Sequence, residues 1–184
     1  MTPKNTFMIM LALATTVAGW DWVMSLEPHW FSTMWGVYYF AGSFLGIFAV
    51  LALLGHGLNR SKLLGDGAVN AEHFHDIGKF LFAFTVFWAY IAFSQYFLIW
   101  YANIPEETIW FAQRAEGSWG VATMFLCVGH FAIPFLFLMP RTIKRHPRAL
   151  VCGACWMLFM HAFDLYWLIM PTHSRDGIHF TLSD

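Results

Sequence analysis

MWGVYYFAGSFLGIFAVLALL, residues Met34 to Leu54, is the stretch that decides the fold class of this chain. None of its residues is charged. At a rise of 1.5 Å per residue, about 20 helical residues cross the roughly 30 Å hydrocarbon layer of a bilayer. Because lipid offers no hydrogen bonds to the backbone, such a run must close its own bonds as a helix. The stretch therefore predicts a transmembrane helix.

Four more apolar runs of similar length accompany this stretch. We therefore predict an all-α fold, an integral membrane bundle of about five transmembrane helices, with the amino terminus inside and the carboxyl terminus outside. The whole chain, 1–184, is expected to form a single transmembrane domain. The expected helices are 7–26, 34–54, 80–102, 117–139 and 149–170. The expected connections are an inner loop 55–77, an outer loop 103–116, an inner loop 140–148 and an outer tail 171–184.

The composition supports a membrane protein and excludes several other classes. Hydrophobic residues make up 59% of the chain and charged residues only 11%, whereas soluble domains carry about 25% charged residues. No room remains for a second, water-soluble domain. The net charge of −1 and the absence of a basic stripe with interleaved aromatic residues argue against a nucleic-acid partner. Cys127, Cys152 and Cys155 lie in apolar runs, which favours small packing residues over a disulfide framework.

The distribution of basic residues predicts the orientation, because cytoplasmic loops carry an excess of Lys and Arg. With the amino terminus inside, only Arg114 and Arg175 fall outside. The remaining basic residues are expected inside: Lys4, Arg60, Lys62, Lys79, Arg141, Lys144, Arg145 and Arg148. Tryptophans at the expected outer ends support the same orientation, since indole rings favour the headgroup region. These are Trp20, Trp22, Trp30, Trp35, Trp100, Trp110, Trp119 and Trp167.

The first helix has an alternative interpretation as a cleaved signal peptide. Lys4 would be its basic region and Thr16–Ala18 its small-residue cleavage site. The apolar run continues past that point to Trp20 and Trp22, which favours a retained helix. The sequence leaves the choice between the two open.

Polar side chains at membrane depth indicate where chemistry could occur, since each is costly unless it has a partner or a water path. Asp21 lies roughly 8 Å below the expected outer surface. Gln95, His161 and Asp164 lie roughly 9 to 14 Å below it on two other helices. His161 and Asp164 are three residues apart and therefore share one helical face. We expect these four residues to form one polar cluster in the outer half.

A second polar group lies at the inner end of the third helix, where we note His73, His75, Asp76 and Lys79. His130 stands between the two groups, roughly 20 Å from the outer surface. Histidine and carboxylate pairs can pass protons through intervening water. The pattern suggests two proton half-paths. Interfacial or loop positions are the simpler alternative for Asp21, His73 and His75.

Two other interpretations of the buried polar residues stay open. His130 and His161 could ligate a b-type haem, with Asp164 orienting one imidazole. Alternatively, the buried polar residues merely link the helices of a structural scaffold. Covalent haem is excluded because no CxxCH occurs, and no Gly-rich phosphate loop, GxSxG or HExxH is present. We expect no metal site.

Three aromatic-rich strings carry a resemblance to a known family. They are DWVMSLEPHWFSTMWGVYYFAG (Asp21–Gly42), HFHDIGKFLFAFTVFWAYIAFSQYFLIWYANIPEETIWF (His73–Phe111) and FDLYWLIMP (Phe163–Pro171). The chain resembles the ActF family, the second of the two polysulfide-reductase-like (NrfD/PsrC-type) membrane subunits of bacterial alternative complex III. That family is often labelled the quinone-binding subunit of quinol:cytochrome c oxidoreductase. The resemblance covers the C-terminal half of the longer family chain.

The resemblance implies a multi-pass subunit in the bacterial inner membrane, within a quinol:cytochrome c or quinol:oxidase electron-transfer complex. Implied partners are the second NrfD/PsrC-like subunit, an iron–sulfur subunit, a multihaem cytochrome c, lipid, and menaquinol or ubiquinol. The redox cofactors would belong to those partners, and this chain would be a non-catalytic subunit. In that family these membrane subunits are thought to offer proton paths. The matching candidates here are Asp21, His73, His75, Asp76, Lys79, Gln95, His161 and Asp164.

Overall fold

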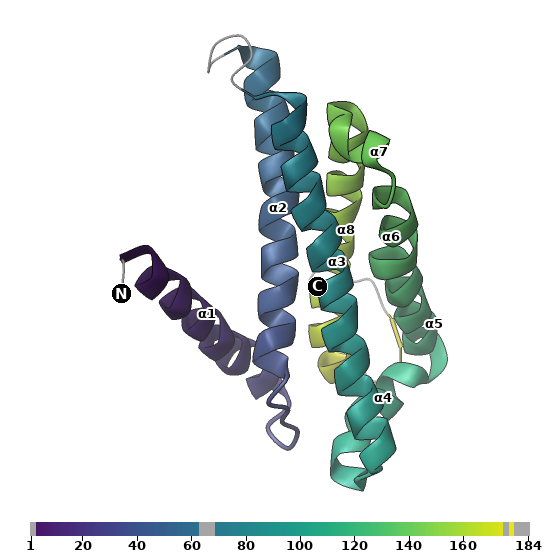
Figure 1. Ribbon diagram of the computed structural model, residues 1–184. Coiled ribbons are helices and arrows are strands. Elements are labelled where there is room, and N and C mark those ends of the chain that lie inside the picture. Colours follow the sequence, from purple (N-terminus) through teal and green to yellow (C-terminus); the bar gives the residue numbers. More distant parts are fainter. Residues whose placement is uncertain (1–2, 63–68, 175–176, 179–184) are drawn as a thin grey trace. The chain divides into compact units, whose positions relative to one another are not determined.

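The computed structural model describes residues 3–62, 69–174 and 177–178, and it is entirely helical in its regular structure over those ranges (Figure 1). Five helical segments are long and apolar enough to cross a membrane. They are Lys4–Leu26, Trp35–Ser61, Ala71–Ala102, Gly117–Leu138 and Pro147–His173. The prediction of an all-α bundle with five membrane-spanning helices is confirmed.

The five spans are built from the longer elements of the chain. These are α1 (Pro3–Trp22), α2 (Trp35–Ser61), α3 (Ala71–Ala102), the series α5 (Gly117–Leu126), η2 (Cys127–Ala132) and α6 (Ile133–Leu138), and α8 (Pro147–His173). A short 3-10 helix, η1 (Met24–Leu26), follows α1.

The predicted inner loop 55–77 is wrong as a loop over most of its described length. Helix α2 continues to Ser61, and α3 already begins at Ala71. A hydropathy pattern marks the part of a helix that fits hydrocarbon, whereas the helix itself can extend into water. The stretch 63–68 lies outside the described residues.

The two shorter predicted loops also contain helices. Helix α4 (Pro105–Ala115) fills most of the predicted outer loop 103–116, and α7 (Arg141–Arg145) lies within the predicted inner loop 140–148. Pro105 stands in the first turn of α4, where its missing N–H costs nothing. The predicted tail is helical up to His173, and 175–176 and 179–184 lie outside the described residues.

The chain forms two compact units, which are considered one at a time. Unit 1 contains Met1–Ala41, Tyr90–Met124 and Leu165–Asp184, and unit 2 contains Gly42–Ala89 and Phe125–Asp164. The core of unit 2 is apolar and includes small residues that let helices approach closely. Its buried members are Leu45, Ala49, Ala52, Phe74, Leu81, Leu138, Leu150, Ala154 and Met157.

Aromatic rings form the interior of unit 1. Trp30 stacks on Trp110 with ring centroids 4.7 Å apart, and Trp35 meets both rings edge-on. Trp110 also meets Trp167 edge-on at 5.4 Å. Five of the eight tryptophans expected at the headgroup level are thus buried in protein: Trp30, Trp35, Trp110, Trp119 and Trp167. Only Trp20, Trp22 and Trp100 are exposed.

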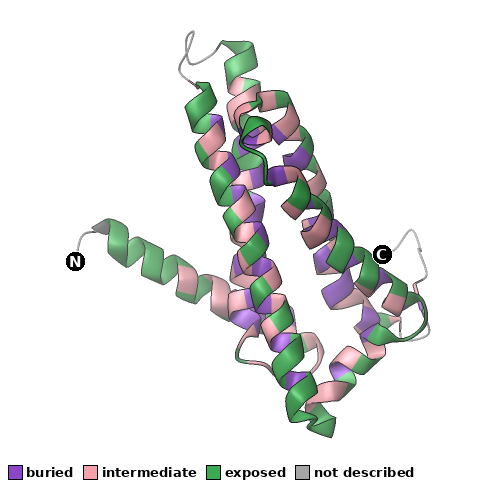
Figure 2. Cartoon of the chain, turned by 45° about the vertical axis from the view of Figure 1, so that its right-hand side comes forward, coloured by how far each residue is buried: buried purple, intermediate pink, exposed green. Residues whose placement is uncertain are grey.

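Helix α1 is largely exposed along its length (Figure 2). Within unit 1, α1 makes its close contacts through small residues. Gly19 of α1 packs against Tyr39, and Thr16 of α1 packs against Gly36. Most of the exposed residues of α1 from Phe7 onward are apolar, including Met8 and Leu13. An apolar, exposed helix of this kind suits lipid surroundings.

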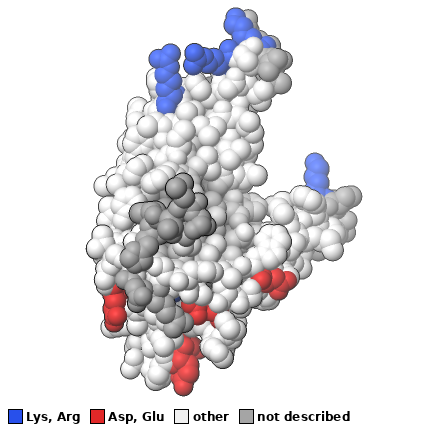
Figure 3. All heavy atoms as spheres, turned by 180° about the vertical axis from the view of Figure 1, so that it is seen from behind, with Lys and Arg blue, Asp and Glu red and all other residues white. Residues whose placement is uncertain are grey.

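Basic side chains gather at one end of unit 2 (Figure 3). That end includes the last turn of α2, with Arg60, and helix α7, with Lys144 and Arg145. These residues belong to the set that the charge pattern assigns to the inner side, whereas Lys4 of that set belongs to unit 1. The orientation itself stays a prediction, and Arg175 lies outside the described residues.

Candidate functional site

Three ionisable side chains converge inside unit 2. His130 comes from η2, and His161 and Asp164 come from α8. One ligand atom from each residue lies within 4.8 Å of the others. His130 and Asp164 are almost fully buried, and His161 is half-buried. We call these three residues the buried triad.

The buried triad depends on a π-helical turn. Residues Cys127–Ala132 form η2, in which the N–H of Ile133 donates to the carbonyl of Val128. Pro134 follows and has no N–H, so the carbonyl of Gly129 receives no donor from the next π-type bond. The Trp156 indole Nε1 donates to that carbonyl at 2.8 Å. Proline, glycine and tryptophan together therefore stabilise the turn that carries His130.

Trp88 of α3 holds the triad from another side. Its indole Nε1 donates to Oδ2 of Asp164 at 3.2 Å. Its ring lies over the His130 imidazole, with centroids 3.8 Å apart. One aromatic residue thus fixes the carboxylate and packs against one histidine at the same time.

A glycine of α2 makes room for the third member of the triad. A Cβ atom at Gly42 would lie 2.9 Å from Cε1 of His161, closer than side chains normally pack, whereas one at Gly46 would lie at an ordinary contact distance of 3.4 Å from Cδ2. A GxxxG pattern in a membrane helix usually serves helix packing. Here Gly42 also accommodates an imidazole, because a larger residue would intrude on the space that the ring occupies.

Several nitrogen atoms of the triad form no hydrogen bond with the described residues. They are Nδ1 and Nε2 of His130 and Nδ1 of His161. Buried polar atoms are almost always satisfied, so each such atom requires an explanation. A separation of up to 4.8 Å between ligand atoms is within reach of one bridging water, which forms two bonds of about 2.8 Å. The triad is therefore suited to holding and passing a proton.

The same donor set could hold a metal ion. Two imidazoles and one carboxylate form a common ligand set for divalent transition metals. The geometry is less suited to haem, because an Asp164 oxygen lies within 4.8 Å of ligand nitrogens of both histidines. A porphyrin ring between two axial histidines would need that space. The expectation that the chain has no metal site stays a prediction.

The inner polar group consists mainly of exposed, paired residues of unit 2. Asn70 Oδ1 accepts the N–H groups of Glu72 and His73, and His73 Nδ1 accepts the Asn70 N–H. His73 is therefore part of a cap at the start of α3. Lys79 pairs with Asp76 at 2.7 Å, and Arg145 pairs with Glu72. His75 is the exception, since its buried Nδ1 forms no hydrogen bond with the described residues.

Asp21 and Gln95 belong to unit 1, whereas His161 and Asp164 belong to unit 2. Asp21 is exposed and Gln95 is buried. The expected cluster of all four residues stays a prediction. Inside unit 2, His130 lies close to the His161–Asp164 pair. The expected membrane depth alone places His130 between the outer and the inner polar groups.

Arg114 is buried, although the charge pattern predicts it only as an outer basic residue. Its guanidinium lies 3.6 Å from the Trp110 ring centroid and 5.4 Å from that of Trp167. It donates to the carbonyls of Trp110 and Leu168. Burial lowers the pKa of Arg114 to about 9, against the opposing effect of the Glu27 carboxylate. The sequence feature that could have indicated this burial is a single arginine among tryptophan-rich segments.

Comparison with known proteins gives no further assignment. No family model matches the chain, and no curated protein matches it.

Proposed function

We propose that this chain is a structural and proton-conducting membrane subunit of a respiratory quinol:cytochrome c, or quinol:oxidase, electron-transfer complex of the alternative complex III type. It would lie in the bacterial inner membrane and hold no redox centre of its own. Iron–sulfur and multihaem cytochrome c partners would carry the electrons, and menaquinol or ubiquinol would supply them. The resemblance in Asp21–Gly42, His73–Phe111 and Phe163–Pro171 supports this placement.

One observation carries the proton-conducting part of the proposal, namely the buried triad. Ionisable residues inside a membrane-spanning bundle are rare and expensive, and they usually mark ion or proton pathways. Here three of them meet at a π-helical turn, a feature that is frequent at functional sites. Histidine exchanges protons near neutral pH more readily than any other unperturbed side chain. The role we assign is therefore a proton station, with Asp164 and the two imidazoles as its acceptors.

The decisive experiment compares Asp164→Asn with Glu106→Gln in the assembled complex. Glu106→Gln is the matched control because it removes an exposed carboxylate that is not among the proton-path candidates. Proton release per electron is measured in proteoliposomes during quinol oxidation. We expect Asp164→Asn to lower the ratio and Glu106→Gln to preserve it. An unchanged ratio in Asp164→Asn, with normal assembly, would remove the proton-station role.

The variant Trp88→Phe distinguishes the proposed proton station from a purely structural scaffold. That variant removes the hydrogen bond to Asp164 but keeps a proton-accepting carboxylate. A scaffold predicts that Trp88→Phe and Asp164→Asn both loosen the complex, as measured by subunit loss in mild detergent. A proton station predicts that Trp88→Phe retains proton release while Asp164→Asn does not.

A bound metal is the second candidate role, and the short separation of the three ligand atoms favours it. Elemental analysis of purified protein and of His130→Ala tests this role directly. Stoichiometric zinc, iron or copper that is lost in the variant would favour a metal centre over a proton station. A Soret band in the reduced-minus-oxidised spectrum would instead support the haem interpretation.

A further inference from the structure

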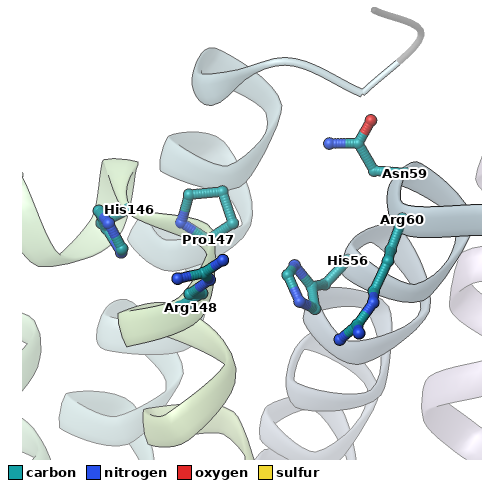
Figure 4. Close-up of a pocket in the computed structure, with 6 residues that line it drawn as sticks. All are labelled: His56, Asn59, Arg60, His146, Pro147 and Arg148. Carbon is teal, nitrogen blue, oxygen red and sulfur yellow. The ribbon is translucent and has the colours of Figure 1, made fainter. Parts of the chain in front are cut away.

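A second polar site lies at the basic end of unit 2, away from the buried triad in sequence. It is an open pocket of about 220 Å³, lined by His56, Asn59, Arg60, His146, Pro147 and Arg148. Figure 4 shows His56, Asn59 and Arg60 on the last turns of α2, and His146, Pro147 and Arg148 where α7 ends and α8 begins. Two guanidinium groups, two imidazoles and one amide thus border one space, and none of the lining residues is acidic.

Local sequence explains how both walls are formed. His56, Asn59 and Arg60 are spaced at i, i+3 and i+4, so they share one face of α2. On the other wall, His146 has an extended conformation (φ −95°, ψ 108°) and ends α7. Pro147 requires this, since a residue before proline avoids the helical region. Helix α8 then begins beside the pocket, and its first amide N–H groups have no partner within the helix.

The pocket has the charge and the donors of an oxyanion site. Among the described residues, neither Arg60 nor Arg148 pairs with a carboxylate, although Arg145 nearby in the chain does. Arginine presents a planar fork that matches phosphate oxygens, and imidazole and amide groups add N–H donors. The start of α8 adds a favourable dipole. The volume of about 220 Å³ is ample for a phosphate group.

The position of the pocket indicates where that phosphate comes from. The charge-free hydropathic stretch of α2 ends at Leu54, two residues before His56, and Pro147 begins the last membrane-spanning helix. The pocket therefore lies at the level of lipid headgroups. The excess of Lys and Arg predicts that this is the cytoplasmic side, where anionic lipids attract basic residues.

We propose that this pocket binds a phosphate group, supplied by the headgroup of an anionic phospholipid. The bound lipid would join the last turns of α2 to the start of α8. Each arginine near an anionic membrane surface strengthens binding about fivefold, so removal of both is expected to weaken it roughly thirtyfold.

The test uses the full chain, purified in mild detergent and titrated with phosphatidylglycerol under native mass spectrometry. The variants are Arg60→Gln, Arg148→Gln and the double variant. Arg141→Gln is the matched control, because it removes an exposed charge from the neighbouring helix α7 without lining the pocket. We expect about fivefold weaker lipid binding in each single variant, roughly thirtyfold in the double variant, and no comparable loss in the control.

Two further titrations distinguish the sources of the phosphate. Phosphatidylcholine reports whether the anionic headgroup is required, and inorganic phosphate reports whether the site takes a soluble ion. Weak phosphatidylcholine binding and no competition by inorganic phosphate would support a lipid site. Competition by millimolar inorganic phosphate would overturn the lipid source. Equal losses in the double variant and in Arg141→Gln would overturn the site itself.

Discussion

The indole Nε1 of Trp88 donates a hydrogen bond of 3.2 Å to Oδ2 of Asp164, and both side chains are buried. Tryptophan is a donor only, so it orients the carboxylate without taking its proton. Because the same ring packs on His130, α3 fixes two members of the buried triad with one side chain. In the proposed proton station, the two histidines are the groups that would exchange protons with Asp164.

Gly42→Ala is expected to disturb the buried triad. The new methyl group would lie 2.9 Å from Cε1 of His161, so the imidazole must move. Gly57→Ala is the control, since nothing lies within 4 Å of a Cβ at that position of α2. Alanine favours a helix over glycine by roughly 0.5–1 kcal/mol. We expect a thermal unfolding scan in detergent to show stabilisation in Gly57→Ala and none in Gly42→Ala.

Trp156→Phe is expected to destabilise the π-helical turn. The substitution keeps an aromatic ring but removes the only side-chain donor to the Gly129 carbonyl that the described residues provide. An unsatisfied buried carbonyl costs about 1–3 kcal/mol. Trp100→Phe, at an exposed position, should change the free energy of unfolding far less. Equal effects in the two variants would show that Trp156 does not support the turn.

Arg114→Lys tests the tryptophan-lined position in unit 1. A lysine cannot reach both carbonyls with a planar fork while lying flat over Trp110, so the substitution is not conservative. We expect a loss of about 1–3 kcal/mol in the free energy of unfolding. Arg141→Lys, an exchange at an exposed site, provides the comparison. A silent Arg114→Lys would mean that the paired hydrogen bonds of the guanidinium to the two carbonyls contribute little.

Sequence reasoning located the membrane-spanning helices, because a charge-free run of about 20 residues has few structural alternatives. It misplaced helix ends, most clearly at Ser61 and Ala71. Hydropathy changes where a helix leaves lipid, whereas a helix ends where its capping and backbone bonds end. Asn70 at the start of α3 shows this distinction, since a cap rather than a polarity change sets the boundary.

The candidate site was predictable in part. The shared face of His161 and Asp164 follows from their spacing, and the structure places them together. Their meeting with His130 did not follow, because it requires the π-helical turn before Pro134 and the space left by Gly42. Both are tertiary features. A proline and a glycine within a hydropathic run predict an irregular helical turn. They do not predict which side chain that turn reorients.

The orientation of the chain is a prediction that reporter fusions can test. We expect alkaline phosphatase fused within 103–116 to be active, because that segment should face the periplasm. A fusion within 140–148, among Arg141, Lys144 and Arg145, should be inactive, since basic loops stay in the cytoplasm. The reverse pattern would invert the assignment of the phosphate pocket to the cytoplasmic leaflet.

The central claim is that Asp164 changes its protonation while the complex oxidises quinol. Infrared difference spectroscopy of the assembled complex measures this directly through the carboxylic C=O band. We predict a turnover-dependent band that is lost in Asp164→Asn and kept in Glu106→Gln. An identical difference spectrum in the unmodified complex and Asp164→Asn would contradict the claim.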